Sequence, residues 1–172
     1  MRGVLVLDID GTLDTADPSA LRALQRFVKK ETIGVYINTA RPPRYCEEPD
    51  WLSLQFASQD KHHCLVHPSP PTSKVINMQA IQQETRVHPR NIVLLDDRPE
   101  NIEAVQRMGF AGIQVQEKYG IQKETVQTFV SMFAPTSTPR CTANISLMAL
   151  TVLCVTLLVC LPRYLPKRQS QA

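Results

Sequence analysis

Short runs of apolar residues alternate with longer stretches of mixed polarity along the first 133 residues. The runs at 4–8, 33–39 and 91–95 are mainly hydrophobic, without regular alternation, which is typical of strands that are buried on both faces. Two weaker runs, at 63–67 and 112–115, predict further strands.

Helical patterns separate these strands. Pro18–Lys30 is expected to be a helix, because Leu21, Leu24 and Val28 recur at helical spacing. The other expected helices are 51–58, one that begins at Lys74, 99–108 and 125–133. The alternation predicts an α/β fold with a Rossmann-like, doubly wound parallel sheet. Ligands of such sheets bind at the carboxyl ends of the strands.

A second apolar segment lies near the end of the chain. Residues 145–161 contain no charged residue and are long enough for a short membrane-spanning helix. We therefore expect a domain at 1–133, a linker at 134–144, a single C-terminal transmembrane anchor at 145–161 and a basic tail at 162–172. A buried terminal helix is the alternative, but the segment is apolar all round.

The domain is expected to lie on the cytosolic side of that membrane, because no secretory signal precedes it. Tails of this kind fit the mitochondrial outer membrane and the endoplasmic reticulum equally well. The five cysteines include no CxxC pair. We therefore expect no disulfide framework and a reducing compartment.

Charge is unevenly distributed along the chain. All 16 acidic residues precede residue 125, whereas four of the 19 basic residues lie beyond the domain. The domain thus has 15 basic against 16 acidic residues and a net charge near −1. This balance disfavours a nucleic-acid partner.

Polar residues follow three of the expected strands at their carboxyl ends: Asp8 and Asp10, then Thr39, then Asp96 and Asp97. In a parallel sheet these strand ends would converge on one crevice. Lys74, at the start of a helix, is positioned to contribute its side chain to the same crevice. A solvated lysine is the alternative for Lys74.

Carboxylates at one point repel each other unless a cation lies between them. Oxygen ligands suit a hard ion such as Mg²⁺, which usually meets a phosphate. One carboxylate could then be a nucleophile that takes a phosphoryl group, and another could serve as acid and then base. Lys74 and the Thr39 hydroxyl could hold the phosphoryl oxygens.

The motifs behind this hypothesis resemble those of the haloacid-dehalogenase-like (HAD) hydrolases. The sequence DIDGT at 8–12 is similar to their DxDGT signature, and VYINT, ending at Thr39, to their second motif. Lys74 fits the third motif, a lysine at a helix start. The stretch IVLLDDRPEN at 92–101 is similar to the fourth, a strand that ends in paired acids. All four occur in the family's order.

The resemblance implies a role for each motif residue. Asp8 would attack phosphorus and become an aspartyl-phosphate, and Asp10 would protonate the leaving oxygen and then activate water. Thr39 and Lys74 would bind the phosphoryl group. The acid at Asp10 indicates a phosphatase or phosphotransferase, because family members that cleave carbon–halogen bonds lack it.

The resemblance also implies a Mg²⁺ cofactor. Its ligands would be the Asp8 carboxylate, the backbone carbonyl of Asp10 and Asp96, with Asp97 binding the ion directly or through its neighbours.

The gaps between motifs bear on substrate size. Neither 8–39 nor 39–74 has room for the cap domain that many relatives insert, so we expect an open, capless site. Such a site suits a phosphoprotein or another large phosphorylated substrate. Residues 41–54 could still form a small lid, with Arg41 contacting substrate.

Two other functions remain open: a non-catalytic, membrane-tethered interaction protein with a HAD fold, and a nucleic-acid 3′-phosphatase. A zinc site in the cluster His62, His63, Cys64 and His67 is a further alternative, but the spacing fits no standard zinc pattern.

Overall fold

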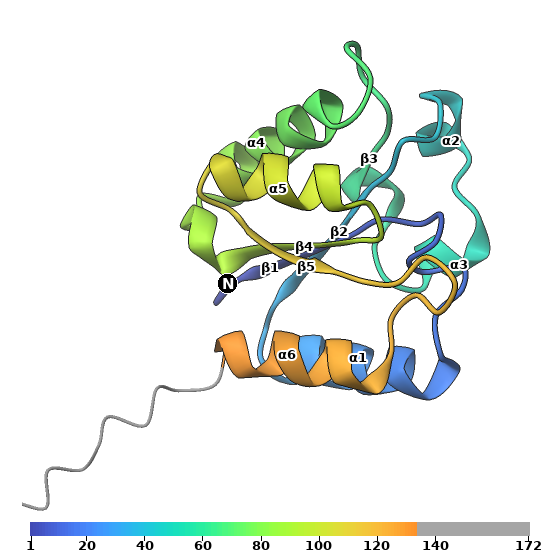
Figure 1. The fold of residues 1–172 in the computed structure, drawn as a ribbon, viewed down its shortest axis with the longest axis vertical. Helices are drawn as coiled ribbons and strands as arrows, with labels where there is room; N and C mark the ends of the chain where they lie inside the picture. Colours follow the sequence, from blue (N-terminus) through green and yellow to red (C-terminus); the bar gives the residue numbers. More distant parts are fainter. Residues whose placement is uncertain (134–172) are drawn as a thin grey trace, which may run out of the picture. The chain divides into compact units, whose positions relative to one another are not determined.

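The computed structural model describes residues 1–133. Five parallel strands form one sheet in the order β3-β2-β1-β4-β5 (Figure 1). The strands are β1 (Val4–Leu7), β2 (Gly34–Asn38), β3 (His62–His63), β4 (Ile92–Asp96) and β5 (Ala111–Gln114). The expected α/β fold with a parallel sheet is confirmed.

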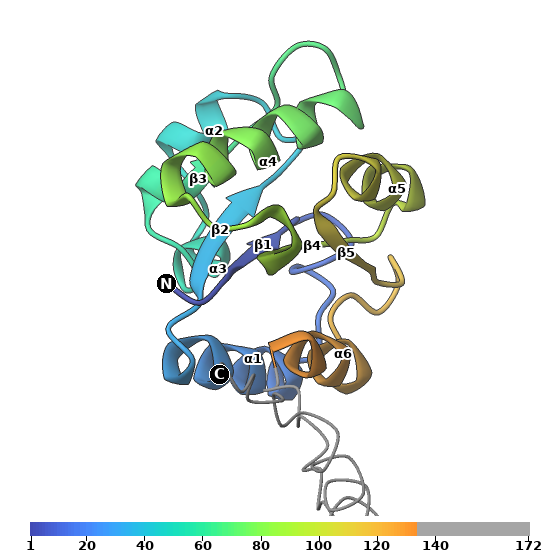
Figure 2. The ribbon, with the colours of Figure 1, turned by 90° about the vertical axis from the view of Figure 1, so that its left-hand side faces the viewer.

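Helices cover both faces of the sheet. They are α1 (Pro18–Lys30), α2 (Arg44–Glu47), α3 (Trp51–Leu54), α4 (Thr72–Thr85), α5 (Pro99–Arg107) and α6 (Lys123–Phe133), with 3₁₀ turns η1 (Gln59–Lys61) and η2 (Pro89–Asn91). In Figure 2, α1 and α6 pack together below the sheet, and α4 and α5 lie together above it.

Strand β1 lies at the centre and is buried on both faces. All four of its residues are fully buried. Leu5 and Leu7 belong to the core between the sheet and helices α1 and α6. Val4 and Val6 belong to the core between the sheet and helices α4 and α5. This is why the run is apolar without alternation, since successive side chains face opposite cores.

Several boundaries differ from the sequence-based expectation. The helix expected at 51–58 ends at Leu54, and the short helix α2 was not expected. The strand expected at 63–67 is limited to β3, and beyond it the Leu65 N–H donates to the Arg41 carbonyl at 2.9 Å. Helix α4 starts at Thr72, which places Lys74 in its first turn.

Cys46 of α2 forms a disulfide with Cys64, just after β3. The expectation that the cysteines form no disulfide is therefore wrong for this pair. The fold brings the two together because β3 pairs with β2 and returns the chain alongside α2.

No helix within residues 1–133 is both long and apolar enough to cross a membrane. The expected linker, anchor and tail, at 134–144, 145–161 and 162–172, lie outside the described residues.

Candidate active site

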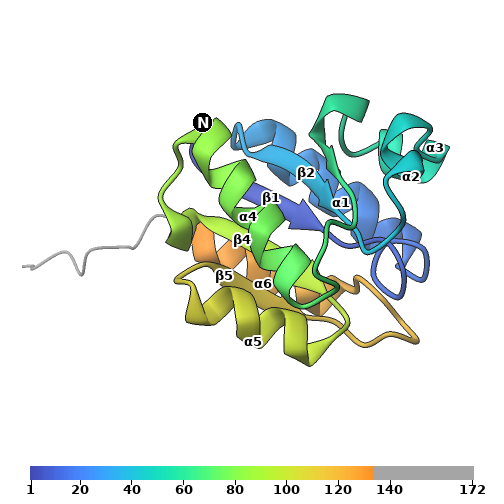
Figure 3. The ribbon, with the colours of Figure 1, turned by 90° about the horizontal axis from the view of Figure 1, so that it is seen from above.

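The carboxyl ends of β1, β2 and β4 meet at one edge of the sheet, because β1 runs parallel between the other two (Figure 3). Asp8 follows β1 directly, Thr39 follows β2, and Asp96 ends β4. The Asp8 N–H continues the pairing beyond the strands by donating to the Leu95 carbonyl at 3.0 Å. The sheet therefore brings these three side chains to one place.

Lys74 carries its ammonium group into this edge from above the sheet. Its Nζ lies 2.6 Å from Asp8 Oδ1 and 3.0 Å from Asp96 Oδ2, and it donates a hydrogen bond to the Asn38 carbonyl. The side chain is only 1% exposed. The alternative of a solvated lysine at the helix start is therefore wrong.

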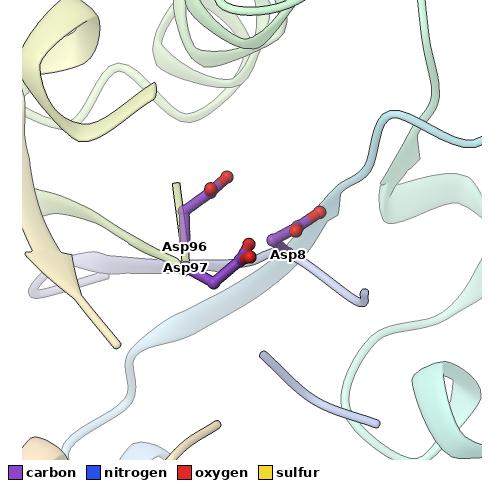
Figure 4. A group of neighbouring side chains, drawn as sticks. All are labelled: Asp8, Asp96 and Asp97. Carbon is purple, nitrogen blue, oxygen red and sulfur yellow. The ribbon is translucent and has the colours of Figure 1, made fainter. Parts of the chain in front are cut away.

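Three carboxylates, those of Asp8, Asp96 and Asp97, gather at the ends of two neighbouring strands (Figure 4). One oxygen of each lies within 4.8 Å of the corresponding oxygen of the other two. Three carboxylates against one ammonium give the cluster a formal charge of −2. That charge equals and opposes the charge of one divalent cation.

Several oxygens at the cluster have unused hydrogen-bonding capacity. Asp97 Oδ1 and Asn101 Oδ1 are buried with no hydrogen-bond partner within residues 1–133, and Asp96 Oδ2 has only its ion pair with Lys74. Spare oxygen lone pairs and a double negative charge form the donor set of a hard divalent cation such as Mg²⁺. The cluster fits such an ion, and Asp8, Asp96 and Asp97 would hold it.

The crowding changes the acidity of two of these groups. Burial raises the pKa of Asp8 to about 6; the positive charge of Lys74 opposes this rise, and the negative charge of Asp96 adds to it. Burial, and then the charge of Asp96, raises the pKa of Asp97. Without a cation the cluster therefore holds protons more tightly than ordinary carboxyl groups do.

Gly11 lets the loop after β1 pass close to the cluster. Its φ is +72°, and a Cβ at this position would lie 2.8 Å from Asp97 Oδ2. Its N–H donates to Asp14 Oδ1 at 2.8 Å, which closes the turn. The glycine of the DIDGT stretch is thus required both by conformation and by space.

Asp10 stands apart from the cluster and pairs with Arg41. Its side chain is 59% exposed, and Arg41 Nη2 donates to its Oδ1 at 2.7 Å. Arg41 Nε lies 3.2 Å from both carboxylate oxygens. The Asp10 carboxylate is not part of the metal-binding group, and ligation by its backbone carbonyl stays a prediction.

The rest of the Arg41 side chain contacts residues from the segment 41–54. Nη1 donates to Asp50 Oδ2 at 2.9 Å, and the guanidinium carbon lies 4.7 Å from the centre of the Tyr45 ring. Arg41 therefore joins this segment, for which we expected a small lid, to Asp10. Contact between Arg41 and substrate stays a prediction.

Thr39 is almost fully buried at the end of β2. Its N–H donates to the His63 carbonyl at 2.9 Å, and its Oγ1 accepts a hydrogen bond from the Arg41 N–H at 3.2 Å. Within residues 1–133 this hydroxyl donates no hydrogen bond, so its hydrogen is available to a ligand.

A hollow of about 110 Å³ opens at this edge. The residues that line it are Asp8, Asp10, Gly11, Ala40, Pro70, Lys74, Asp97, Arg98, Asn101 and Glu117. Pockets that enclose whole small-molecule ligands are commonly about 300 to 1,000 Å³. The hollow therefore suits a small group, such as a phosphoryl group, better than a complete metabolite.

Sequence reasoning missed three buried asparagines that support the charged groups. Asn38 Nδ2 donates to the Lys74 carbonyl at 3.0 Å, and Asn77 Nδ2 donates to Asn38 Oδ1 at 2.9 Å. Asn101 Nδ2 donates to Asp96 Oδ1 at 2.9 Å. Asn38 interrupts an apolar strand, and that was the available signal, because a buried amide requires partners.

The histidine-rich stretch does not form a zinc site. Cys64 is bound to Cys46, and both ring nitrogens of His62 have protein partners, the Ser58 carbonyl at 2.9 Å and Ser53 Oγ at 3.1 Å. These groups instead hold β3 against the segment that contains α3.

No protein-family model matches the chain, and neither does a curated protein sequence. Among solved structures, the chain is similar to an uncharacterized protein from Corynebacterium glutamicum. The identity is 21% and the TM-score 0.57, over 77% of this chain and 96% of that one.

Two further likenesses are weaker. One is to the core domain of a Streptococcus pneumoniae protein provisionally named a phosphoglycolate phosphatase, at 17% identity and TM-score 0.48, over 76% of this chain and 96% of that one. The other is to the HAD domain of the Legionella pneumophila effector Lem4. The identity is 14% and the TM-score 0.47, over 77% of this chain and 95% of that one. The Corynebacterium likeness shows a shared fold.

Proposed function

We propose that the chain is a Mg²⁺-dependent phosphatase of the HAD-like kind, which hydrolyses phosphoric monoesters through an aspartyl-phosphate at Asp8. The observation that carries the proposal is the position of Asp8. Its carboxylate lies 2.6 Å from the Lys74 ammonium group, lines the hollow and belongs to the three-carboxylate cluster.

The cofactor would be held by Asp8, Asp96 and Asp97, whose net charge with Lys74 is −2. When bound, Mg²⁺ would offset the negative charge of both the carboxylates and the incoming phosphoryl group. This offset is needed before an anionic carboxylate can approach an anionic phosphate.

The residues of the chain itself would divide the remaining work. Lys74 orients the Asp8 carboxylate and, with the Thr39 hydroxyl, donates hydrogen bonds to the phosphoryl oxygens. Asp10 gives a proton to the leaving oxygen and later takes one from water. Since Arg41 contacts both oxygens of Asp10, one of these contacts must loosen for that proton transfer.

The substrate is proposed to be a phosphoprotein or another large phosphorylated molecule. This is supported by the size of the hollow, about 110 Å³, which has room for a phosphoryl group but not for a large molecule. Between β1 and α4 the chain forms only α1, β2, α2, α3, η1 and β3. These short elements support an open site of the capless type.

Attachment of this domain to a membrane through 145–161 is part of the same proposal. It is supported by the uncharged, apolar composition of that segment. Extraction of membranes at alkaline pH tests it, because an anchored chain stays in the pellet and a peripheral one is released.

Hydrolysis of p-nitrophenyl phosphate by the full chain tests the catalytic proposal. We expect phosphate release that requires Mg²⁺ and stops with EDTA. The Asp8→Asn variant should lose at least a thousandfold in rate, since it removes the nucleophile but keeps the size of the side chain. Asp60→Asn, an exposed change on η1, is the matched control and should keep the wild-type rate. Full activity of Asp8→Asn with a normal circular dichroism spectrum would overturn the mechanism.

A further inference from the structure

A second and larger cavity adjoins the hollow. It has a volume of about 530 Å³, and we call it the 41–48 groove. Its lining residues are Arg41, Pro42, Arg44, Tyr45, Glu47 and Glu48. The groove is thus built from one continuous stretch of chain, which includes α2.

The ion pair between Arg41 and Asp10 forms the boundary between the two cavities. Asp10 lines the hollow, Arg41 lines the groove, and their side chains meet at 2.7 Å. A molecule that extends out of the hollow past Asp10 therefore enters the 41–48 groove.

Phosphoryl transfer sends the leaving group in that direction. The attacking and leaving oxygens lie roughly in line on opposite sides of phosphorus. With Asp8 as nucleophile, the leaving oxygen faces away from Asp8 and must lie within reach of the acid that protonates it, Asp10. The part of the substrate attached to that oxygen then lies in the groove.

The groove carries an excess of negative charge. Arg41 is already paired with Asp10 and Asp50. The remaining charges are one positive, Arg44, and two negative, the adjacent Glu47 and Glu48. Within residues 1–133 neither glutamate has an ion-pair partner, and both are exposed. They are free to pair with a cation on the substrate.

Contacts on its far side hold the groove in shape. Cys46, next to Glu47, is bound to Cys64, and the side chain of Gln59 donates a hydrogen bond to the Glu47 carbonyl. The Tyr45 hydroxyl lies 2.9 Å from Ser53 Oγ. A surface held in this way loses little entropy when a ligand binds.

We propose that the 41–48 groove binds the peptide chain beside a phosphorylated residue and selects phosphopeptides with lysine or arginine at that flank. The inference rests on the proposed phosphatase function and names its substrate class. Tyr45 and Pro42 offer apolar surface to the peptide, and Glu47 and Glu48 pair with its basic side chains.

The test compares two phosphopeptides of equal length, one flanked by lysine and arginine, the other by aspartate and glutamate. We expect the wild-type chain to prefer the basic peptide in kcat/KM by roughly fivefold, the size expected of two exposed ion pairs. The preference should shrink as salt is raised, because salt screens exposed charges.

The double variant Glu47→Gln/Glu48→Gln should abolish the preference, and its hydrolysis of p-nitrophenyl phosphate is measured alongside to show that the catalytic site is intact. Glu103→Gln/Glu124→Gln, on α5 and α6, is the matched control: it alters net charge equally and should keep the preference. Binding of both peptides to the Asp8→Asn chain, followed by fluorescence anisotropy, gives a readout that does not need turnover.

These measurements separate the two ideas. If p-nitrophenyl phosphate is hydrolysed but the Gln variant keeps the preference, or the wild type has none, the groove inference is wrong. Faster hydrolysis of a phosphorylated oligonucleotide than of the basic peptide would also overturn it. If binding shows the preference but nothing is hydrolysed, the groove stands and the phosphatase function fails.

Discussion

Lys74 is the residue on which the charge balance of the site depends. It is the cation in contact with both Asp8 and Asp96, and it is as deeply buried as the core leucines. Removing one partner of a buried charge cluster is costly, because the remaining charges are left without compensation.

We predict that Lys74→Met lowers the free energy of unfolding in EDTA by roughly 3 to 5 kcal/mol. With saturating Mg²⁺ the loss should be clearly smaller, because the cation restores part of the missing positive charge. Urea unfolding under both conditions measures the difference. Arg107→Met, which removes an exposed ion pair with Glu103, should change stability by less than about 0.5 kcal/mol. An equal loss with and without Mg²⁺ would argue against cation binding at the cluster.

His63 makes the stability of the fold dependent on pH. Burial lowers the pKa of its ring below the ordinary value near 6.5; Glu84 opposes this shift, and His62 adds to it. Its Nε2 is buried with no hydrogen-bond partner within residues 1–133. The folded chain therefore favours the neutral ring, whereas the unfolded chain takes up a proton near pH 6.5.

The contribution of His63 to the free energy of unfolding is thus fully present above pH 6.5 and is lost as the pH falls below that value. We predict that His63→Gln flattens the decrease in unfolding free energy between pH 7 and pH 5, as measured by urea titration at each pH. His67→Gln, at an exposed histidine, should leave the slope as in the wild type. An unchanged slope in His63→Gln would show that other groups cause the decrease.

At this scale the sequence allowed the convergence of these polar side chains to be predicted, but not the groups that support them. Asp8, Thr39, Lys74 and Asp96 were placed by strand ends and motif order. The pairing of Asp10 with Arg41 could not be foreseen, because the path of the chain after β2 decides which loop faces Asp10.

At the scale of elements, the segment from α2 to β3 differs most from what the sequence suggested. Its apolar residues are sparse, so periodicity could not set the ends of the short helices or of β3. The ends of a long helix with clear periodicity could be predicted: α1 has the bounds that its apolar spacing and Pro18 predict. What holds the segment together is specific bonding, including the disulfide and the Asp50 cap on the Ser53 N–H at 2.9 Å.

The disulfide should contribute measurably to the stability of this segment and of the fold. It joins residues 18 positions apart. Closing a loop of that size lowers the entropy of the unfolded chain and so stabilises the folded state by about 3 kcal/mol. We predict that dithiothreitol lowers the unfolding free energy of the wild type by about this amount. Cys46→Ser should start from the lower value and not respond to the reductant. A wild-type protein that is equally stable in both conditions would exclude a structural role for the bond.

At the scale of the whole molecule, the sheet order explains why the candidate site lies at one edge of the sheet. Strand β1 lies between β2 and β4, so the residues after three strands converge, while α4 supplies Lys74 from above. An apolar core lies on each face of the sheet. The continuous apolar runs carried enough information for the fold class, because a strand buried on both faces requires covering layers on each side.

The central claim is that Asp8 is a nucleophile, and trapping its phosphorylated form tests this most directly. The full chain is mixed with Mg²⁺ and a phosphopeptide, quenched in acid during turnover and reduced with borohydride, which converts an aspartyl-phosphate to homoserine. Peptide mass spectrometry then locates the change. We predict homoserine at position 8, only when Mg²⁺ and substrate are both present. Rapid phosphate release with an unmodified Asp8, or with the modification at another residue, would contradict the account.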